Sequence, residues 1–280
     1  MKHNRFFSIL ATLLLMLSAQ VAAQLEVTLK PQRQEYMLGE DVYVELMLYN
    51  NSDTSLALDR TPEHPWLTIV ASRAGENIDL SPKVRANFPK VVLGPAQKMA
   101  YKIKLNQIFN LPVDGTYRVN AVVCLPDRKT SFTSPRARFR ISNGALVKKF
   151  TTHVRGKRLE MRAKLSRIDG RDAVFGQVAD ADSGRVLGAA HMGQYLNFMQ
   201  PCLLLDAKQN LHMFFQSTPE FFTYSILSTT GKCSHSQIYK RVPGVPLNLV
   251  SAGGKVRVIG AAPYVKPKDG VHKDAGDRPF

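Results

Sequence analysis

The amino-acid sequence predicts an all-β protein with two domains, preceded by a cleaved signal helix. Apolar and polar residues alternate with a period of two through much of the chain, which is typical of strands with one buried face. No convincing amphipathic helix interrupts these strands. A segment of the second half also repeats after 45 residues (246 − 201), which indicates a supersecondary unit used twice.

Residues 1–23 predict a secretory signal peptide. Lys2 and Arg5 precede an apolar run that ends at Leu17, and Val21 and Ala23 stand at the −3 and −1 positions of a cleavage site. The apolar run of about 12 residues is shorter than the ~20 that a membrane-spanning helix needs. We therefore expect a periplasmic or secreted protein that begins near Gln24 and has no transmembrane span after cleavage.

The net charge of +16 favours an anionic partner. Loss of Lys2 and Arg5 with the signal peptide lowers it to +14 (36 basic minus 22 acidic residues). In an exported protein this charge suits acidic polysaccharide or lipid head groups better than nucleic acid, which we do not expect as a partner. The alternative is a basic surface that only keeps the protein soluble.

The first domain is predicted to span residues 24–146 as a β-sandwich. Val42, Val44, Leu46 and Leu48 define one face of a strand, and further strands are expected at the ranges 25–29, 66–70 and 98–105. The strand at 66–70 contains the only Trp and is expected to be central. Proline and glycine occupy the breaks between strands, as turns require.

Two short motifs resemble immunoglobulin-like modules. Asp114-Gly115-Thr116-Tyr117-Arg118-Val119 is similar to their D-x-G-x-Y-x-C segment, with Val119 in place of the cysteine. The segment from Tyr36 to Val42 resembles the Y-x-x-G-E-x-V opening of exported immunoglobulin-like and macroglobulin-like modules. The resemblance implies a sandwich without the inter-sheet disulfide, and it implies no chemistry.

The second domain is predicted at residues 159–264, after a basic linker at 147–158 and before a disordered tail at 265–280. Its repeat aligns Pro201–Phe214 with Pro246–Ile259, and each copy is a strand, a tight turn and a second strand. Asp206 to His212 resembles the D-x-x-G-x-x-H hairpin of bacterial propeller repeats. The repeat length is that of one four-stranded blade, so we expect a propeller-like β-meander, although too few blades for a closed ring.

We predict no catalytic, cofactor-binding or metal-binding residues and no cofactor, because the histidines and cysteines match no known spacing. Asp180 to Gly184 is interpreted as a hairpin turn rather than a calcium loop. His212 is expected to pack among apolar neighbours or to make a hairpin hydrogen bond rather than to ligate a metal. Cys202 and Cys233 are expected to lie on the first and fourth strands of a meander, too far apart for a disulfide.

The candidate binding residues are Arg136, Arg138 and Arg140, which alternate with apolar residues and so present three guanidinium groups on one face of a strand. They suit carboxylate or phosphate groups of an anionic ligand. The alternative interpretation is that they protect an exposed sheet edge from aggregation.

These observations favour an exported, non-catalytic binding or scaffolding protein of the cell envelope or extracellular space, in contact with anionic polysaccharide or an envelope protein. One alternative is a carbohydrate-active hydrolase with a propeller-type domain. Another is a protease-inhibitor-like module, whose exposed bait loop would be the stretch from Ser81 to Pro95.

Overall fold

The protein is nearly all β, as the sequence predicts. The computed structural model describes residues 24–59, 64–76, 79–84, 86–126 and 129–265. The helix α2 (Leu105–Ile108) has four residues, and no helix of the described part is both long and apolar enough to cross a membrane. The predicted signal peptide and all but the first residue of the predicted tail lie outside the described residues.

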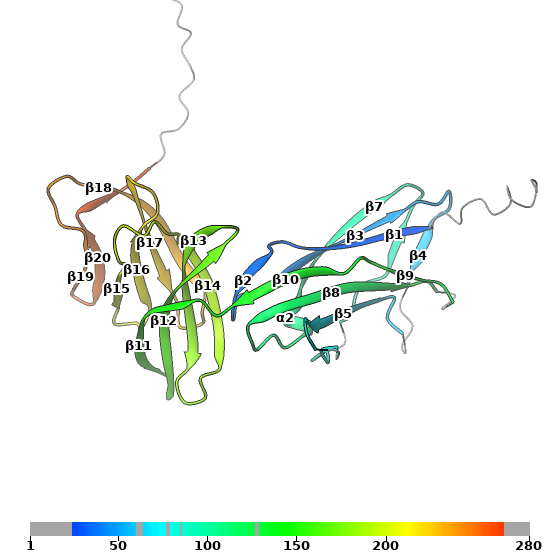
Figure 1. The fold of residues 1–280 in the computed structure, drawn as a ribbon, viewed down its shortest axis with the longest axis horizontal. Helices are drawn as coiled ribbons and strands as arrows, with labels where there is room; N and C mark the ends of the chain where they lie inside the picture. Colours follow the sequence, from blue (N-terminus) through cyan, green and yellow to red (C-terminus); the bar gives the residue numbers. More distant parts are fainter. Residues whose placement is uncertain (1–23, 60–63, 77–78, 85, 127–128, 266–280) are drawn as a thin grey trace, which may run out of the picture. The chain divides into compact units, whose positions relative to one another are not determined.

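The chain divides into two compact units (Figure 1). The first unit comprises the described residues of 1–32, 43–110 and 117–138, and the second unit comprises those of 33–42, 111–116 and 139–280. The second unit therefore includes a segment from early in the chain.

The first unit contains one whole sheet and most of another, which also includes residues of the second unit. One is antiparallel and has the order β1-β3-β7, with β1 (Leu25–Pro31), β3 (Tyr43–Asn50) and β7 (Lys98–Lys104). In β3, Val44, Leu46 and Leu48 are fully buried and alternate with more exposed residues, so the predicted stripe is confirmed. A short pair, β4 (Leu56–Leu58) with β6 (Val91–Leu93), adds to this unit.

The other sheet has the order β2-β10-β8-β5, with β9 also paired to β8. Its strands are β2 (Glu35–Met37), β5 (Leu67–Arg73), β8 (Gly115–Cys124), β9 (Ser131–Thr133) and β10 (Ala137–Ser142). The strand that follows Trp66 was expected to be central, but β5 ends the order and pairs only with β8. Trp66 itself is buried and donates its indole N–H to the carbonyl of Pro89 at 2.9 Å.

The second unit contains two antiparallel meanders. The first has the order β11-β12-β13-β14, with β11 (Ala145–Val154), β12 (Lys157–Ile168), β13 (Arg171–Asp180) and β14 (Val186–Gln194). The second has the order β15-β16-β17-β18-β21, with β15 (Cys202–Leu205), β16 (Leu211–Gln216), β17 (Phe221–Leu227), β18 (Cys233–Arg241) and β21 (Ala261–Pro263).

The meanders pack face to face and form a shared core. Met161 of β12, Val178 of β13, Met213 and Phe215 of β16, and Leu227 of β17 belong to this buried cluster. The opposite face of the second meander is covered by the hairpin of β19 (Asn248–Ala252) and β20 (Lys255–Ile259). Both faces of β16 are therefore buried, which explains why all six of its residues are inaccessible although His212 and Gln216 are polar.

The repeated segments form equivalent local structures. Pro201–Phe214 contains β15 and the start of β16, and Pro246–Ile259 contains β19 and β20, so each copy includes an antiparallel hairpin. The second hairpin does not begin a new four-stranded unit, because its apolar side chains cover the second meander and β21 rejoins that sheet beside β18. The described strands form no closed propeller.

The predicted linker at 147–158 is wrong, because these residues form the antiparallel hairpin of β11 and β12. Phe150 and Val154 pack against the core of the second unit, and Thr152 between them is also buried. A bulge between Leu146 and Lys148 shifts the alternation. Because of the bulge and the polar Thr152, the alternation of apolar and polar residues that indicates a buried face is not visible in this part of the sequence.

Candidate basic binding site

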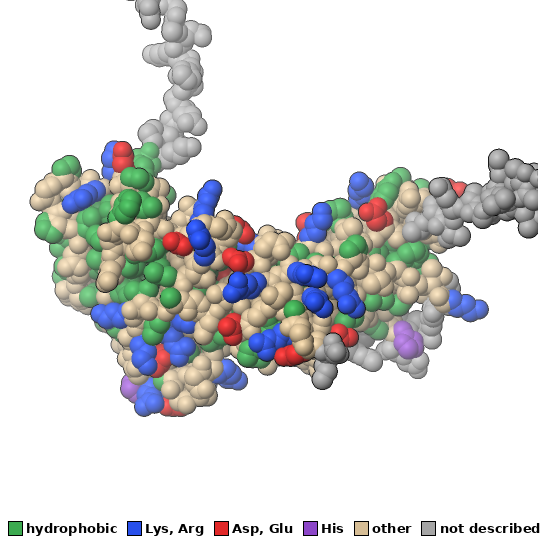
Figure 2. Space-filling model, viewed as in Figure 1, with side chains coloured by type: hydrophobic (Ala, Val, Ile, Leu, Met, Phe, Trp, Pro, Cys, Tyr) green, Lys and Arg blue, Asp and Glu red, His purple; other side chains and the backbone are tan. Residues whose placement is uncertain are grey.

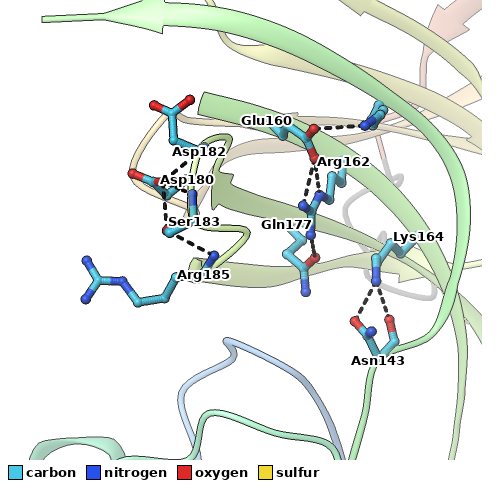
Figure 3. A network of polar contacts seen from close by, with 10 residues as sticks. Asn143, Glu160, Arg162, Lys164, Gln177, Asp180, Asp182, Ser183 and Arg185 are labelled. Carbon is cyan, nitrogen blue, oxygen red and sulfur yellow. Dashed lines mark hydrogen bonds and ion pairs between the residues drawn. The ribbon is translucent and has the colours of Figure 1, made fainter. Parts of the chain in front are cut away.

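A row of charged side chains lies on the face of β12 that points away from the core, at Glu160, Arg162 and Lys164 (Figure 3). Glu160 accepts hydrogen bonds from Nζ of Lys149 at 2.9 Å and from Nε of Arg162 at 2.8 Å. These bonds, from Lys149 first and then Arg162, lower the pKa of the Glu160 carboxyl. Arg162 also donates to the side-chain oxygen of Gln177 at 3.3 Å.

The side chains of this row find their hydrogen-bond partners within the second unit and connect its strands. Lys164 is 5% exposed and donates to both the carbonyl and the side-chain oxygen of Asn143, each at 2.6 Å. Burial lowers the pKa of Lys164, and the charge of Arg162 lowers it further. Gln177 donates to the carbonyl of Leu38 at 2.9 Å and so fastens the early segment to the sheet. We interpret the row as structural.

The row ends at a depression of about 400 Å³, which we call the first basic depression. Its lining residues come from β2, β10 and the β12–β13 hairpin: Glu35, Arg140, Ser142, Ser166, Arg167 and Gly170. The hydroxyl oxygens of Ser142 and Ser166 lie 3.3 Å apart. Guanidinium groups and hydroxyls are the groups that bind the charged and neutral oxygens of an acidic ligand.

The turn between β12 and β13 positions this depression. Ile168 pairs with Arg171, which leaves a two-residue loop of Asp169 and Gly170 with φ values of +48° and +77°. Two positive φ angles are the signature of a type I′ turn, for which Asp-Gly is a preferred sequence. Arg167 donates its Nε–H to the carbonyl of Gly170 at 3.0 Å, and this bond holds the guanidinium over the turn.

Arg140 reaches the depression because β10 pairs in parallel with β2, opposite Glu35. Its side chain is exposed and has no hydrogen bond or ion pair with any residue that the structure describes. Phe139 and Ile141 on either side are buried, which fixes the direction in which Arg140 points. An exposed guanidinium without an internal partner is available to a ligand.

The other predicted arginines are also exposed, and Arg138 shares its face of β10 with Arg140. Arg136 precedes the strand. Arg136 and Arg138 belong to the first unit and Arg140 to the second, and of the three only Arg140 lines the first basic depression. β2 pairs with β10 over Arg140–Ser142, so Arg140 does not lie on a free sheet edge, and edge protection stays an alternative for Arg136 and Arg138.

Four other lining residues of this depression were not predicted as binding residues from the sequence: Ser142, Ser166, Arg167 and Gly170. The signal that could have found the turn is the Asp169-Gly170 dipeptide between two strands. No sequence pattern indicated that the two serines line a site, because only the folded chain brings the ends of β10 and β12 together.

His212 occupies a buried polar network that offers no access to a substrate. Its Nε2 lies 3.1 Å from Oδ2 of Asp206, and its Nδ1 lies 2.5 Å from the hydroxyl of Tyr224. Asn210 also donates to Asp206, through its backbone and side chain. His212 and Tyr224 are 5% and 7% exposed, and Leu249 packs on Tyr224 from β19. The predicted hairpin hydrogen bond of His212 is confirmed.

The turn at Asp180 is also confirmed as a hairpin turn, between β13 and β14 (Figure 3). Oδ1 of Asp180 accepts hydrogen bonds from the backbone N–H of Asp182 and Ser183 and from the Ser183 hydroxyl. These bonds lower the pKa of Asp180, chiefly through Ser183. In the described part of the chain, no group of three or more His, Cys, Asp or Glu side chains is placed to hold a metal ion.

The stretch proposed as a bait loop is tied to the first unit at several points. Pro82 forms a bridge with Phe109, and Lys83 donates its backbone N–H to Ile108 at 2.7 Å and its Nζ to Asn106 at 3.0 Å. Pro89 accepts the hydrogen bond from Trp66. These contacts restrain the stretch, although Val84 within it is 62% exposed.

No protein-family model matches the sequence, and no curated protein matches it. Solved structures show weak similarity. The DNA glycosylase AlkC of Pseudomonas fluorescens, bound to DNA with an abasic-site analogue, aligns at a TM-score of 0.30 and 14% identity, over 46% of this chain and only 33% of its own. The periplasmic chaperone SfaE aligns with a TM-score of 0.25 and 12% identity, over 76% of this chain and 98% of its own. The CupB2 chaperone of Pseudomonas aeruginosa aligns with a TM-score of 0.25 and 10% identity, over 74% of this chain and 96% of its own. Scores this low carry no argument about the protein.

Proposed function

We propose that the protein is an exported, non-catalytic binding or scaffolding protein that contacts acidic polysaccharide of the cell envelope or extracellular space. The observation that carries the proposal is the first basic depression, which is lined by Arg140, Arg167 and two serine hydroxyls. Arg140 has no side-chain partner among the described residues, and Arg167 is 3.9 Å from a carboxylate oxygen of Asp172. Arginine binds a carboxylate through two parallel hydrogen bonds, and serine hydroxyls bind the neutral oxygens of a sugar.

The proposed architecture is an immunoglobulin-like sandwich followed by propeller-like meanders. In support, Tyr117 and Val119 of the resembling motif are buried in β8, and each meander of the second unit has four consecutive antiparallel strands. The hydrolase alternative gains no support from the described strands, because a catalytic propeller needs residues that converge on the axis of a closed ring.

The test measures retention of the protein on immobilised polygalacturonate at several salt concentrations. Arg140→Gln combined with Arg167→Gln should lower the affinity about tenfold, because two exposed ion pairs contribute up to about 1 kcal/mol each. The candidate binding residues predicted from the sequence are tested by the triple replacement of Arg136, Arg138 and Arg140 with glutamine. Binding by the unaltered protein should weaken as salt screens exposed charges over ~8 Å.

A control variant must remove the same charge elsewhere. Arg241→Gln with Arg257→Gln does so on β18 and β20, where both side chains are exposed and line neither basic depression. It should leave retention nearly unchanged. An equal loss of affinity in both double variants would mean that net charge alone drives binding, and the proposed site would be wrong.

A further inference from the structure

A second depression of about 470 Å³ lies on the other flank of the same turn. Its polar lining comes from Arg33, Asp169, Arg171, His191 and Gln194, and no residue of this set was singled out from the sequence. We call it the second basic depression. Ile168 and Ala173 supply its apolar part.

Arg33 is held in place before any ligand arrives. Its guanidinium bonds Oε1 of Glu40 at 2.8 Å and lies 4.6 Å from the ring centre of Tyr36. Glu40 also accepts the backbone N–H of Met37 at 2.8 Å. A side chain fixed by such contacts loses little conformational entropy when it binds.

Arg171 provides the available positive charge of the second basic depression, and His191 is a titratable group beside it. Arg171 is exposed and has no side-chain partner among the residues that the structure describes. The ring of His191 rests edge-on against Phe175, with 5.2 Å between ring centres. Burial lowers the pKa of His191, and the charge of Arg33 lowers it further, so His191 is largely neutral at pH 7.

The two depressions are neighbours. Both use the β12–β13 hairpin, with Ser166, Arg167 and Gly170 in the first and Ile168, Asp169 and Arg171 in the second. They also use adjacent parts of the early segment, Glu35 and Arg33. The lining residues of the two depressions follow one another along a single hairpin, from Ser166 to Arg171, so the two depressions lie side by side at this turn.

We propose that the two basic depressions are adjacent subsites for one acidic oligosaccharide, each taking a carboxylate of a different uronic acid unit. Asp169, Gln194, Ser142 and Ser166 then bind hydroxyl groups between the charges. This inference rests on the proposed function, which requires only that an acidic polysaccharide binds.

The lining favours a saccharide over an anionic membrane. Membrane-surface proteins place apolar side chains beside their basic residues, where they enter the lipid. Here the exposed apolar residues Ile238, Val242, Val245 and Ile259 lie on β18 and β20 and in the loop after β18, where Figure 2 shows hydrophobic side chains gathered at one end of the second unit. None of them lines either depression.

The test uses calorimetry with galacturonic acid and its linear oligomers of two to four units, on the exported protein. The unaltered protein should bind the trimer and tetramer at least about tenfold more tightly than the monomer, because the second subsite adds to the first. Arg171→Gln with His191→Gln should abolish this gain with length, so that the variant binds the tetramer no more tightly than the monomer. Arg140→Gln with Arg167→Gln should weaken every ligand.

A pH series provides a second readout. A carboxylate bound beside His191 favours the protonated ring, whose other charged neighbours are Arg33, Arg171 and Asp169. Tetramer affinity should therefore rise about threefold or more as the pH falls from 7 to 5. His191→Gln should remove this rise.

The outcomes separate the two proposals. If the gain with length persists in the Arg171 and His191 variant while the Arg140 and Arg167 variant still loses affinity, the second subsite is wrong and the proposed function stands. If the Arg140 and Arg167 variant binds polygalacturonate normally, the placement of the site and the two-subsite inference are wrong. If the unaltered protein does not bind polygalacturonate, the proposed function is wrong as well. Equal binding of neutral maltotetraose, or binding only to phosphatidylglycerol vesicles, would also overturn both.

Discussion

Tyr224 is the buried side chain whose ionisation has the largest consequence. Burial raises its pKa to about 12, and negative charge on Tyr239 and Asp206 contributes. The pKa of an unfolded tyrosine is about 10, so the folded state favours the protonated phenol. The resulting stabilisation is complete below pH 10 and is lost as the pH rises towards 12.

Tyr224→Phe therefore has an effect that depends on pH. At pH 8 it should lower the free energy of unfolding by about 1–2 kcal/mol, because the phenol no longer bonds His212. Between pH 10 and 12 the difference from the unaltered protein should shrink, which urea unfolding at pH 8 and pH 11 can measure. Tyr101→Phe is the control, since the Tyr101 hydroxyl has no hydrogen-bond partner among the described residues. A constant difference across this range would contradict the role given to Tyr224.

The partners of His212 illustrate what the sequence can predict at this scale. Asp206 and His212 flank one turn, so their hydrogen bond follows from the hairpin alone. Tyr224 comes from the next strand and faces His212 diagonally, through the pairing of Phe214 with Tyr224. That contact depends on the register of β16 with β17, which residue patterns do not determine.

At the scale of elements, strands with one buried apolar face and one exposed polar face could be predicted from the sequence. Strands in which this alternation is interrupted could not. β1 and β3 alternate cleanly and were predicted. β11 was missed because of its bulge and its buried Thr152. The position of Arg140 beside Ser166 could not be predicted, since it depends on how β2, β10 and the β12–β13 hairpin meet.

The order of strands in the second meander separates two cysteines, as predicted. Cys202 begins β15 and Cys233 begins β18, with β16 and β17 between them, and all three cysteines are free. Burial raises the pKa of the Cys202 thiol, so less of it is the reactive thiolate at neutral pH. Cys233 is exposed on its strand.

These environments predict different rates of thiol modification. With an aromatic disulfide reagent at pH 8, one thiol of the native protein should react quickly, and all three should react after denaturation. Cys233→Ser should remove the fast phase, whereas Cys202→Ser should leave it unchanged. A Cys202–Cys233 bridge found by peptide mapping would show that this strand order is wrong.

For the whole molecule, the expected export sets the conditions under which the basic site works. Leu25 of β1 is 1% exposed, and the carbonyl of Gln24 accepts a hydrogen bond from Asn51 at 2.9 Å. Cleavage after Ala23 would therefore leave these contacts of β1 in place. It would also remove the positive charges of Lys2 and Arg5.

Export predicts a mature N-terminus within two or three residues of Gln24 when the full chain is expressed in a Gram-negative host. Intact-mass spectrometry of the periplasmic fraction measures it directly. Leu14→Arg should block processing, because a charge interrupts the apolar run that the export machinery recognises, whereas Leu14→Ile keeps the run apolar and should be processed normally. An intact Met1 on soluble protein in the cytoplasm would contradict export. It would also remove the setting in which acidic polysaccharide is the expected partner, and the charge of the basic depressions would then need another explanation.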